Sequence, residues 1–288
     1  MNDRIGQPGF QGKKEIENLL TDSAAFVLKS LSASKNYQNR TNPDRLEIIA
    51  QAYTSACATT TNATIYLLLG GFIFEAAILS RSFLESASKA WVVLLANENG
   101  RSSLLADFES LIPAEARRKR GSIDALNNAT PESNQALQFM RDLAKNPEDQ
   151  GLSKVSDTVM KRIVKRFKYG NLLQEIEVAA KDKGMPVDFA LLRFHYAHSS
   201  DYSHVNASAL ITLEQLTKID SPNKQTIGDS SVAGLCGLCV LVWYYTQCFW
   251  ALYQGSDGPK EHAAFSEAQK ILHRVKAKCD VVADDIFG

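Results

Sequence analysis

Hydrophobic positions along this 288-residue chain repeat with the spacing of α-helices, and the alternation typical of strands is nearly absent. Good helix formers fill the segments between the breaks. Helices are expected over 15–31, 44–69 and 72–97, with Asp44 as an N-cap and Gly70-Gly71 turning the chain. The last two helices predict a long antiparallel hairpin, with one continuous kinked helix as the alternative.

The second half of the chain is expected to continue in helices separated by proline and glycine. They are predicted over 102–120, 131–145, 156–183 with a division near Gly170, 187–216, from about 228 to 255, and 260–284. The pattern predicts an all-α, antiparallel helical bundle. Residues 1–12 are expected as a flexible tail, and residues 13–288 as a single domain with a variable, locally basic insertion near 100–168.

One apolar segment, residues 230–256, carries no lysine or arginine and is long enough to cross a bilayer. No second convincing span and no flanking basic cluster accompanies it. A helix that is apolar on all sides is also what the centre of a bundle requires. We therefore expect a buried core helix, and no membrane partner.

Composition indicates which broad class of protein this chain belongs to. The chain is 45% hydrophobic, which supports a sizeable core, and its formal net charge is zero, which argues against action through bulk charge. Five cysteines without a framework spacing suit a reducing cytoplasm. Cys236-x2-Cys239 lies in the apolar segment and is interpreted as two buried small hydrophobes. Neither a metal nor a cofactor is expected, because no HExxH motif and no phosphate-binding glycine loop is present.

Candidate chemistry gathers in RFHYAHSSDYSH, residues 193–204, which holds three of the five histidines. On a helix, His198 lies about 140° from Arg193, and His195 lies on another face. At most one or two histidines of one chain therefore share a site with Arg193. The spacing aligns a single stripe of side chains, namely Arg193, Tyr196, Ser200 and His204.

A second polar set interrupts the apolar helix over 72–97. Arg81 and Glu85 stand at i and i+4, with Glu75 a turn and a half earlier. Charges in such a helix are costly to bury unless they are paired. Arg81 and Glu85 either form a plain surface pair or dock against the stripe, where Glu85 would orient His204 and set its pKa.

These two motifs carry a family resemblance. Arg81-Ser82-x-Leu84-Glu85, followed by Tyr-x3-Ser-x3-His ending at His204, resembles the bacterial family catalogued as domain of unknown function 5677. The resemblance covers residues 45–255. It implies a helical architecture rather than an activity, because that family is uncharacterised.

The chain also resembles the broader HEPN superfamily of helical bundles, in which many members are metal-independent ribonucleases of toxin or phage-defence systems. Their Arg-x4–6-His motif is matched by Arg193-x4-His198, although Phe194 departs from the polar residue common after the arginine. The resemblance implies a histidine that moves the 2′-OH proton and an arginine that stabilises charge on the phosphate. It also implies a homodimer with facing motifs, and an antitoxin or other protein as partner.

Basic residues concentrate between 117 and 168, with twelve lysines and arginines against six acidic residues. This density is typical either of a solvated surface or of one that contacts phosphate backbones. The like-charge i, i+4 pairs favour an anionic partner, because they destabilise an isolated helix. The candidate RNA-binding residues are Arg117, Arg118, Lys119, Arg120, Lys161, Arg162, Lys165 and Arg166.

Two functions remain open from the sequence. The first is a cytoplasmic, metal-independent ribonuclease in a toxin or phage-defence setting. It would use Arg193 with His198, or Arg81 and Glu85 with the stripe. The alternative is a non-catalytic helical module that binds a protein or small ligand, in which the Tyr196, Ser200 and His204 stripe is a structural hydrogen-bond network.

Overall fold

The computed structural model describes residues 14–37, 43–111, 156–185, 189–203, 224–255 and 263–287. Every regular element within these ranges is a helix, so the all-α prediction is confirmed. The predicted helix over 131–145 lies outside the described residues, as do Arg117 to Arg120 and His204.

The chain divides into two compact units. The first comprises Met1–Leu95 and Ile176–Gly288, and the second is Ala96–Glu175. The second unit takes in the segment that the sequence sets apart as an insertion near 100–168. Each unit has a core of its own.

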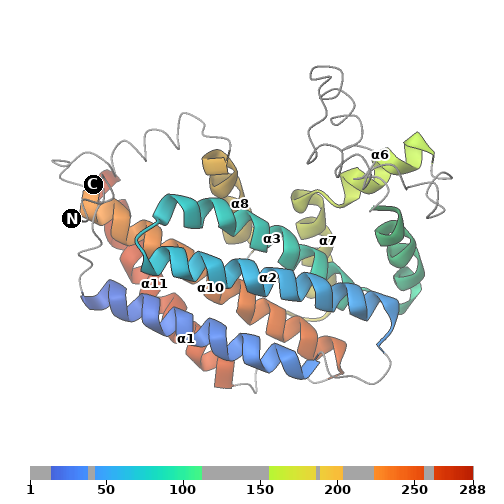
Figure 1. The fold of residues 1–288 in the computed structure, drawn as a ribbon, viewed down its shortest axis with the longest axis horizontal. Coiled ribbons are helices and arrows are strands. Elements are labelled where there is room, and N and C mark those ends of the chain that lie inside the picture. Colours follow the sequence, from blue (N-terminus) through green and yellow to red (C-terminus); the bar gives the residue numbers. More distant parts are fainter. Residues whose placement is uncertain are drawn as a thin grey trace, which may run out of the picture. The chain divides into compact units, whose positions relative to one another are not determined.

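The first unit is organised around the long apolar helix α10 (Lys224–Tyr253). Its Gly228–Tyr253 stretch is the only helix among the described residues long and apolar enough to cross a membrane, and 83% of its most apolar window is buried within the protein. The segment is therefore a core helix. Figure 1 shows the helices that pack around it, namely α1 (Lys14–Tyr37), α2 (Arg45–Leu69), α3 (Ile73–Leu95) and α11 (Ala263–Phe287).

Two buried tryptophans align α10 with the hairpin formed by α2 and α3. The indole nitrogen of Trp91 on α3 donates to Thr246 Oγ1 at 2.9 Å. That of Trp250 donates to Thr54 Oγ1 on α2 at 3.2 Å. Because a buried indole N–H needs an acceptor, each bond fixes the height at which its helix lies against α10.

The predicted hairpin is confirmed, and the continuous kinked helix is not formed. Asp44 caps α2 by accepting from the backbone nitrogen of Glu47 at 2.8 Å. At the far end Gly71 adopts a φ of 79°, which disfavours any side chain. The backbone nitrogen of Phe72 then donates to the carbonyl of Leu67 at 2.8 Å, which closes a Schellman motif and reverses the chain.

The second unit contains a helix over 98–111, helix α6 (Asp157–Arg166) and the start of α7 (Tyr169–Asp182). The rings of Phe108 and Phe167 pack with their centroids 4.5 Å apart. The predicted division near Gly170 occurs instead at Phe167 and Lys168. The side-chain amide of Asn171 donates to the carbonyl of Lys165 at 2.5 Å, which satisfies the end of α6 before α7 begins.

Two glycines of α10 provide a matched test of packing. A Cβ at Gly237 would lie 2.7 Å from Val275 Cγ1 of α11, whereas one at Gly234 would meet only His195 Cε1 at 3.6 Å. Gly237→Ala should lower the free energy of unfolding by about 1–2 kcal/mol, because overlap outweighs helix propensity. Gly234→Ala should raise it by up to about 1 kcal/mol. Urea denaturation checks both values, and equal effects would contradict the close α10–α11 contact.

Candidate functional site

Helix α8 (Phe189–Ser203) carries most of the candidate residues and lies against α3. Its inner side buries Phe189, Leu192 and Ser199. The Phe189 ring stacks on Tyr245 of α10 at a centroid distance of 6.1 Å. This apolar anchor fixes which positions of α8 face α3 and which face outward.

The crossing of α3 and α8 is made by two small side chains. Ser80 and Ser199 are both buried, and their hydroxyl oxygens lie 2.5 Å apart. Small residues let two helices approach closely, so longer polar side chains on either side of the crossing come within reach of one another. Neither serine was among the predicted site residues, because Ser80 stands in an apolar run and Ser199 lies off the stripe of Tyr196 and Ser200.

A polar cluster adjoins this crossing. Arg81 Nε donates to Glu85 Oε1 at 3.0 Å, and the Tyr196 hydroxyl donates to the same oxygen at 2.9 Å. Arg81 Nη1 donates to Ser200 Oγ at 3.3 Å, and the guanidinium carbon lies 5.3 Å from the centre of the Tyr196 ring. The predicted docking of the Arg81–Glu85 pair on the stripe is thus confirmed for Tyr196 and Ser200, in a cluster of four side chains that we call the α3–α8 cluster.

The α3–α8 cluster is only partly screened from solvent. The side chains of Arg81 and Glu85 are 28% and 40% exposed. Burial and the hydrogen bond to Glu85 raise the pKa of Tyr196. Partial burial acts to lower the pKa of Arg81, but Glu85 and Tyr196 outweigh it and the pKa is raised overall. At neutral pH the phenol is therefore a proton-bearing donor and the guanidinium is charged.

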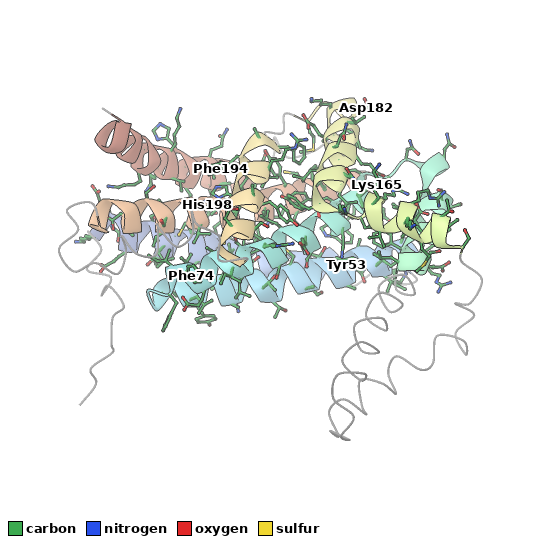
Figure 2. All side chains as sticks on the ribbon, turned by 90° about the horizontal axis from the view of Figure 1, so that it is seen from above. Tyr53, Phe74, Lys165, Asp182, Phe194 and His198 are labelled. Atoms are coloured by element: carbon green, nitrogen blue, oxygen red, sulfur yellow. The ribbon has the colours of Figure 1, made fainter. Side chains whose placement is uncertain are left out.

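The two residues of the Arg193-x4-His198 motif have different partners in this chain. Arg193 Nη2 donates to Glu177 of α7 at 2.6 Å, and Lys181 donates to the other oxygen of that carboxylate at 2.9 Å. The His198 ring instead stacks on Phe194, with centroids 5.8 Å apart and planes 9° from parallel. Figure 2 labels Phe194 and His198 on α8. Phe194 is 62% exposed, which the sequence did not indicate.

Both described histidines of α8 are held in the neutral form. Burial lowers the pKa of His198, and Asp201 opposes the effect. Burial also lowers the pKa of His195 to about 4, with a smaller contribution from His198. The His195 ring lies beside Gly234 of α10, so this histidine is part of the packing.

The candidate RNA-binding residues of α6 divide into two kinds. Arg162 and Arg166 donate to the two oxygens of Asp107, a carboxylate that is only 8% exposed, at 2.9 and 2.5 Å. Arg166 also bonds to Glu175. Lys161 and Lys165 are exposed. The like-charge arginine pair, interpreted above as a sign of an external anion, is thus explained by an internal carboxylate.

The described cysteines behave as small core residues. Cys57, Cys236, Cys239 and Cys248 are free and buried, and burial raises the pKa of Cys236 to about 12. A thiol with so high a pKa is protonated and unreactive at neutral pH. Within the described residues, no three histidine, cysteine or acidic side chains are grouped as metal ligands.

Comparison with known proteins gave no match among family models, curated proteins or solved structures. The resemblances drawn from Arg81-Ser82-x-Leu84-Glu85 and from Arg193-x4-His198 therefore stay predictions. The geometry of the α3–α8 cluster and of the outer face of α8 carries the functional argument.

Burial of His195 makes stability depend on pH. The folded protein keeps this imidazole neutral down to about pH 4, whereas the unfolded chain takes up a proton near 6.5. The unfolded state binds more protons between these values, so stability should fall by about 3 kcal/mol as the pH drops through that window. Urea denaturation of the wild type and His195→Gln should give a flatter pH dependence for the variant.

The exposed His273 of α11 supplies the matched control, because its substitution removes a histidine that the fold does not bury. His273→Gln should follow the wild-type pH dependence. Parallel curves for His195→Gln and the wild type would contradict the burial of a neutral imidazole.

Proposed function

We propose that the protein is a metal-independent ribonuclease whose active site includes the α3–α8 cluster. One observation carries the proposal: Arg81 and Glu85 meet Tyr196 and Ser200 from a helix more than a hundred residues later, at a place that solvent still reaches. These are residues of the two motifs that the sequence sets apart. A merely structural ion pair on α3 has no need of a phenol and a hydroxyl from α8.

The chemistry follows from the groups present. Arg81 stays charged and its 3.3 Å contact with Ser200 is long, so a phosphate oxygen can replace the serine as acceptor. Tyr196 stays protonated and acts as a donor rather than a base. His204 follows Ser200 by four residues in the sequence and would accept the 2′-OH proton. The 2′ oxygen then attacks the phosphorus to form a 2′,3′-cyclic phosphate, and the P–O5′ bond breaks. The leaving 5′ oxygen takes the proton of Tyr196.

The biological setting is proposed on the resemblance alone. A cytoplasmic toxin or phage-defence ribonuclease that works as a homodimer, with an antitoxin as partner, would fit the family expectation. Within one chain Arg193 donates to Glu177 and the His198 ring stacks on Phe194; in such a dimer Arg193 of one protomer and His198 of the other could meet.

The deciding experiment is cleavage of labelled single-stranded RNA and tRNA in excess EDTA. Wild type should cleave, and both His204→Ala and Arg81→Gln should lose about 100-fold or more of the rate. His273→Ala is the matched control and should leave the rate unchanged. Circular dichroism confirms that each variant is folded.

Each alternative outcome has a definite meaning. Loss of cleavage in folded His198→Ala but not in His204→Ala would move the site to the outer face of α8. Cleavage that needs a divalent metal, or no cleavage by the wild type, would refute the ribonuclease.

A second candidate function is a binding module in which the α3–α8 cluster is purely structural. This alternative is favoured because Arg81 Nε and the Tyr196 hydroxyl both donate a hydrogen bond to Glu85 Oε1. The hydrogen-bonding groups of the cluster therefore pair with one another without a ligand. Such a network stabilises the crossing of α3 and α8 and leaves function to another surface.

The structural contribution of the cluster can be measured with a double-mutant cycle. Tyr196→Phe should lower the free energy of unfolding by about 1 kcal/mol, because it removes the hydroxyl that donates to the Glu85 carboxylate at a partly exposed position. In a Glu85→Ala background the same substitution should cost almost nothing. Strictly additive effects in urea denaturation would show that the Tyr196–Glu85 bond contributes nothing to stability.

A further inference from the structure

Three exposed lysines lie close together in the second unit. Lys161 and Lys165 stand one turn apart on α6, and Lys168 lies at the break between α6 and α7. The backbone nitrogen of Lys168 donates to the carbonyl of Lys165 at 3.3 Å, which holds Lys168 next to the end of α6. We call these residues the lysine row; Figure 2 labels Lys165 within it.

The arginines of the same helix are engaged elsewhere. Arg162 and Arg166 converge on the nearly buried carboxylate of Asp107, and Arg166 also binds Glu175. The ion pairs found among the described side chains do not include the three lysines. Internal carboxylates therefore neutralise the arginines, and the lysine row presents its positive charge to solvent.

We propose that the lysine row binds the phosphate backbone of a single RNA strand. The charge of the row is complementary to phosphate, and lysine recognises phosphate as a point charge without need of a shaped pocket. The identity of the nucleic acid as RNA rests on the proposed ribonuclease function. The row would hold the strand without regard to sequence, because backbone contacts carry no base information.

The spacing of the lysine row fits this partner. Lys161 and Lys165 are separated by about 6 Å along the axis of α6. One strand of a nucleic acid duplex carries a charge roughly every 3.4 Å along its axis. Neighbouring lysines of the row are therefore spaced on the scale of one or two phosphates, and each flexible side chain can follow a strand whose path is not regular.

The test is fluorescence anisotropy with a labelled 20-nucleotide RNA whose riboses are 2′-O-methylated, so that it has no 2′-OH to attack. The full chain carrying Lys161→Gln, Lys165→Gln and Lys168→Gln should bind about tenfold or more weakly at low salt. Its slope of log affinity against log salt should be smaller by about 2, because three phosphate contacts are lost.

A matched triple variant removes the same charge from the first unit. It replaces the exposed Lys183, Lys270 and Lys276 with glutamine and should bind as the wild type does. Equal weakening by both triple variants would overturn the proposal, since net charge alone would then explain it. The proposal would also be overturned if an acidic peptide of the same length bound as tightly as the RNA and lost affinity in the lysine-row variant to the same extent. The partner of the row would then be a protein.

This test separates the lysine row from the ribonuclease. If the wild type cleaves no RNA and binding still depends on the row, the proposed function fails and the RNA-binding surface stands. If the wild type cleaves RNA in EDTA and the lysine variant binds unchanged, the surface fails and the ribonuclease stands.

Discussion

Burial of α10 is the constraint on which the arrangement of the first unit depends. A helix without a single charge over residues 230–255 cannot face water, so α1, α2, α3 and α11 must cover it. Covering it sets the height of each neighbour, through the Trp91–Thr246 and Trp250–Thr54 bonds. Once α3 is set in this way, the side of α3 that carries Arg81 and Glu85 points away from α10 and toward α8.

The position of α8 makes those charges tolerable. Phe189 anchors α8 on Tyr245 of α10, and the Ser80–Ser199 contact brings it close to α3. Arg81 and Glu85 are then partly desolvated, and that cost is offset because Tyr196 and Ser200 supply hydrogen bonds. The polar cluster is thus a consequence of helix packing, whether or not it also performs chemistry.

The sequence predicted what depends on local pattern and missed what depends on distant partners. The cap at Asp44 and the reversal at Gly70-Gly71 are encoded within a few residues, and both are confirmed. Stripe spacing likewise indicated that Tyr196 and Ser200 share a face. The partners of Arg193 and Arg166 could not be predicted, because Glu177 and Asp107 lie on other helices and have no distinctive spacing. The burial of His195 against Gly234 was hidden for the same reason.

The hydrogen bonds and ion pairs within the protein restrict which side chain could be the general base of the proposed ribonuclease. A general base must be unprotonated, and it must not already be engaged in a hydrogen bond within the protein. Tyr196 fails the first condition because its pKa is raised, and Glu85 already accepts two hydrogen bonds at one oxygen. In the proposed ribonuclease the cluster would orient a phosphate and donate a proton to it, and an imidazole would accept the 2′-OH proton. In the described part of α8 that leaves His198 on the outer face, since the His195 ring packs beside Gly234 of α10; along the stripe it leaves His204. The two sites differ in which arginine a phosphate would meet, Arg81 across the helix crossing or Arg193 of a second protomer.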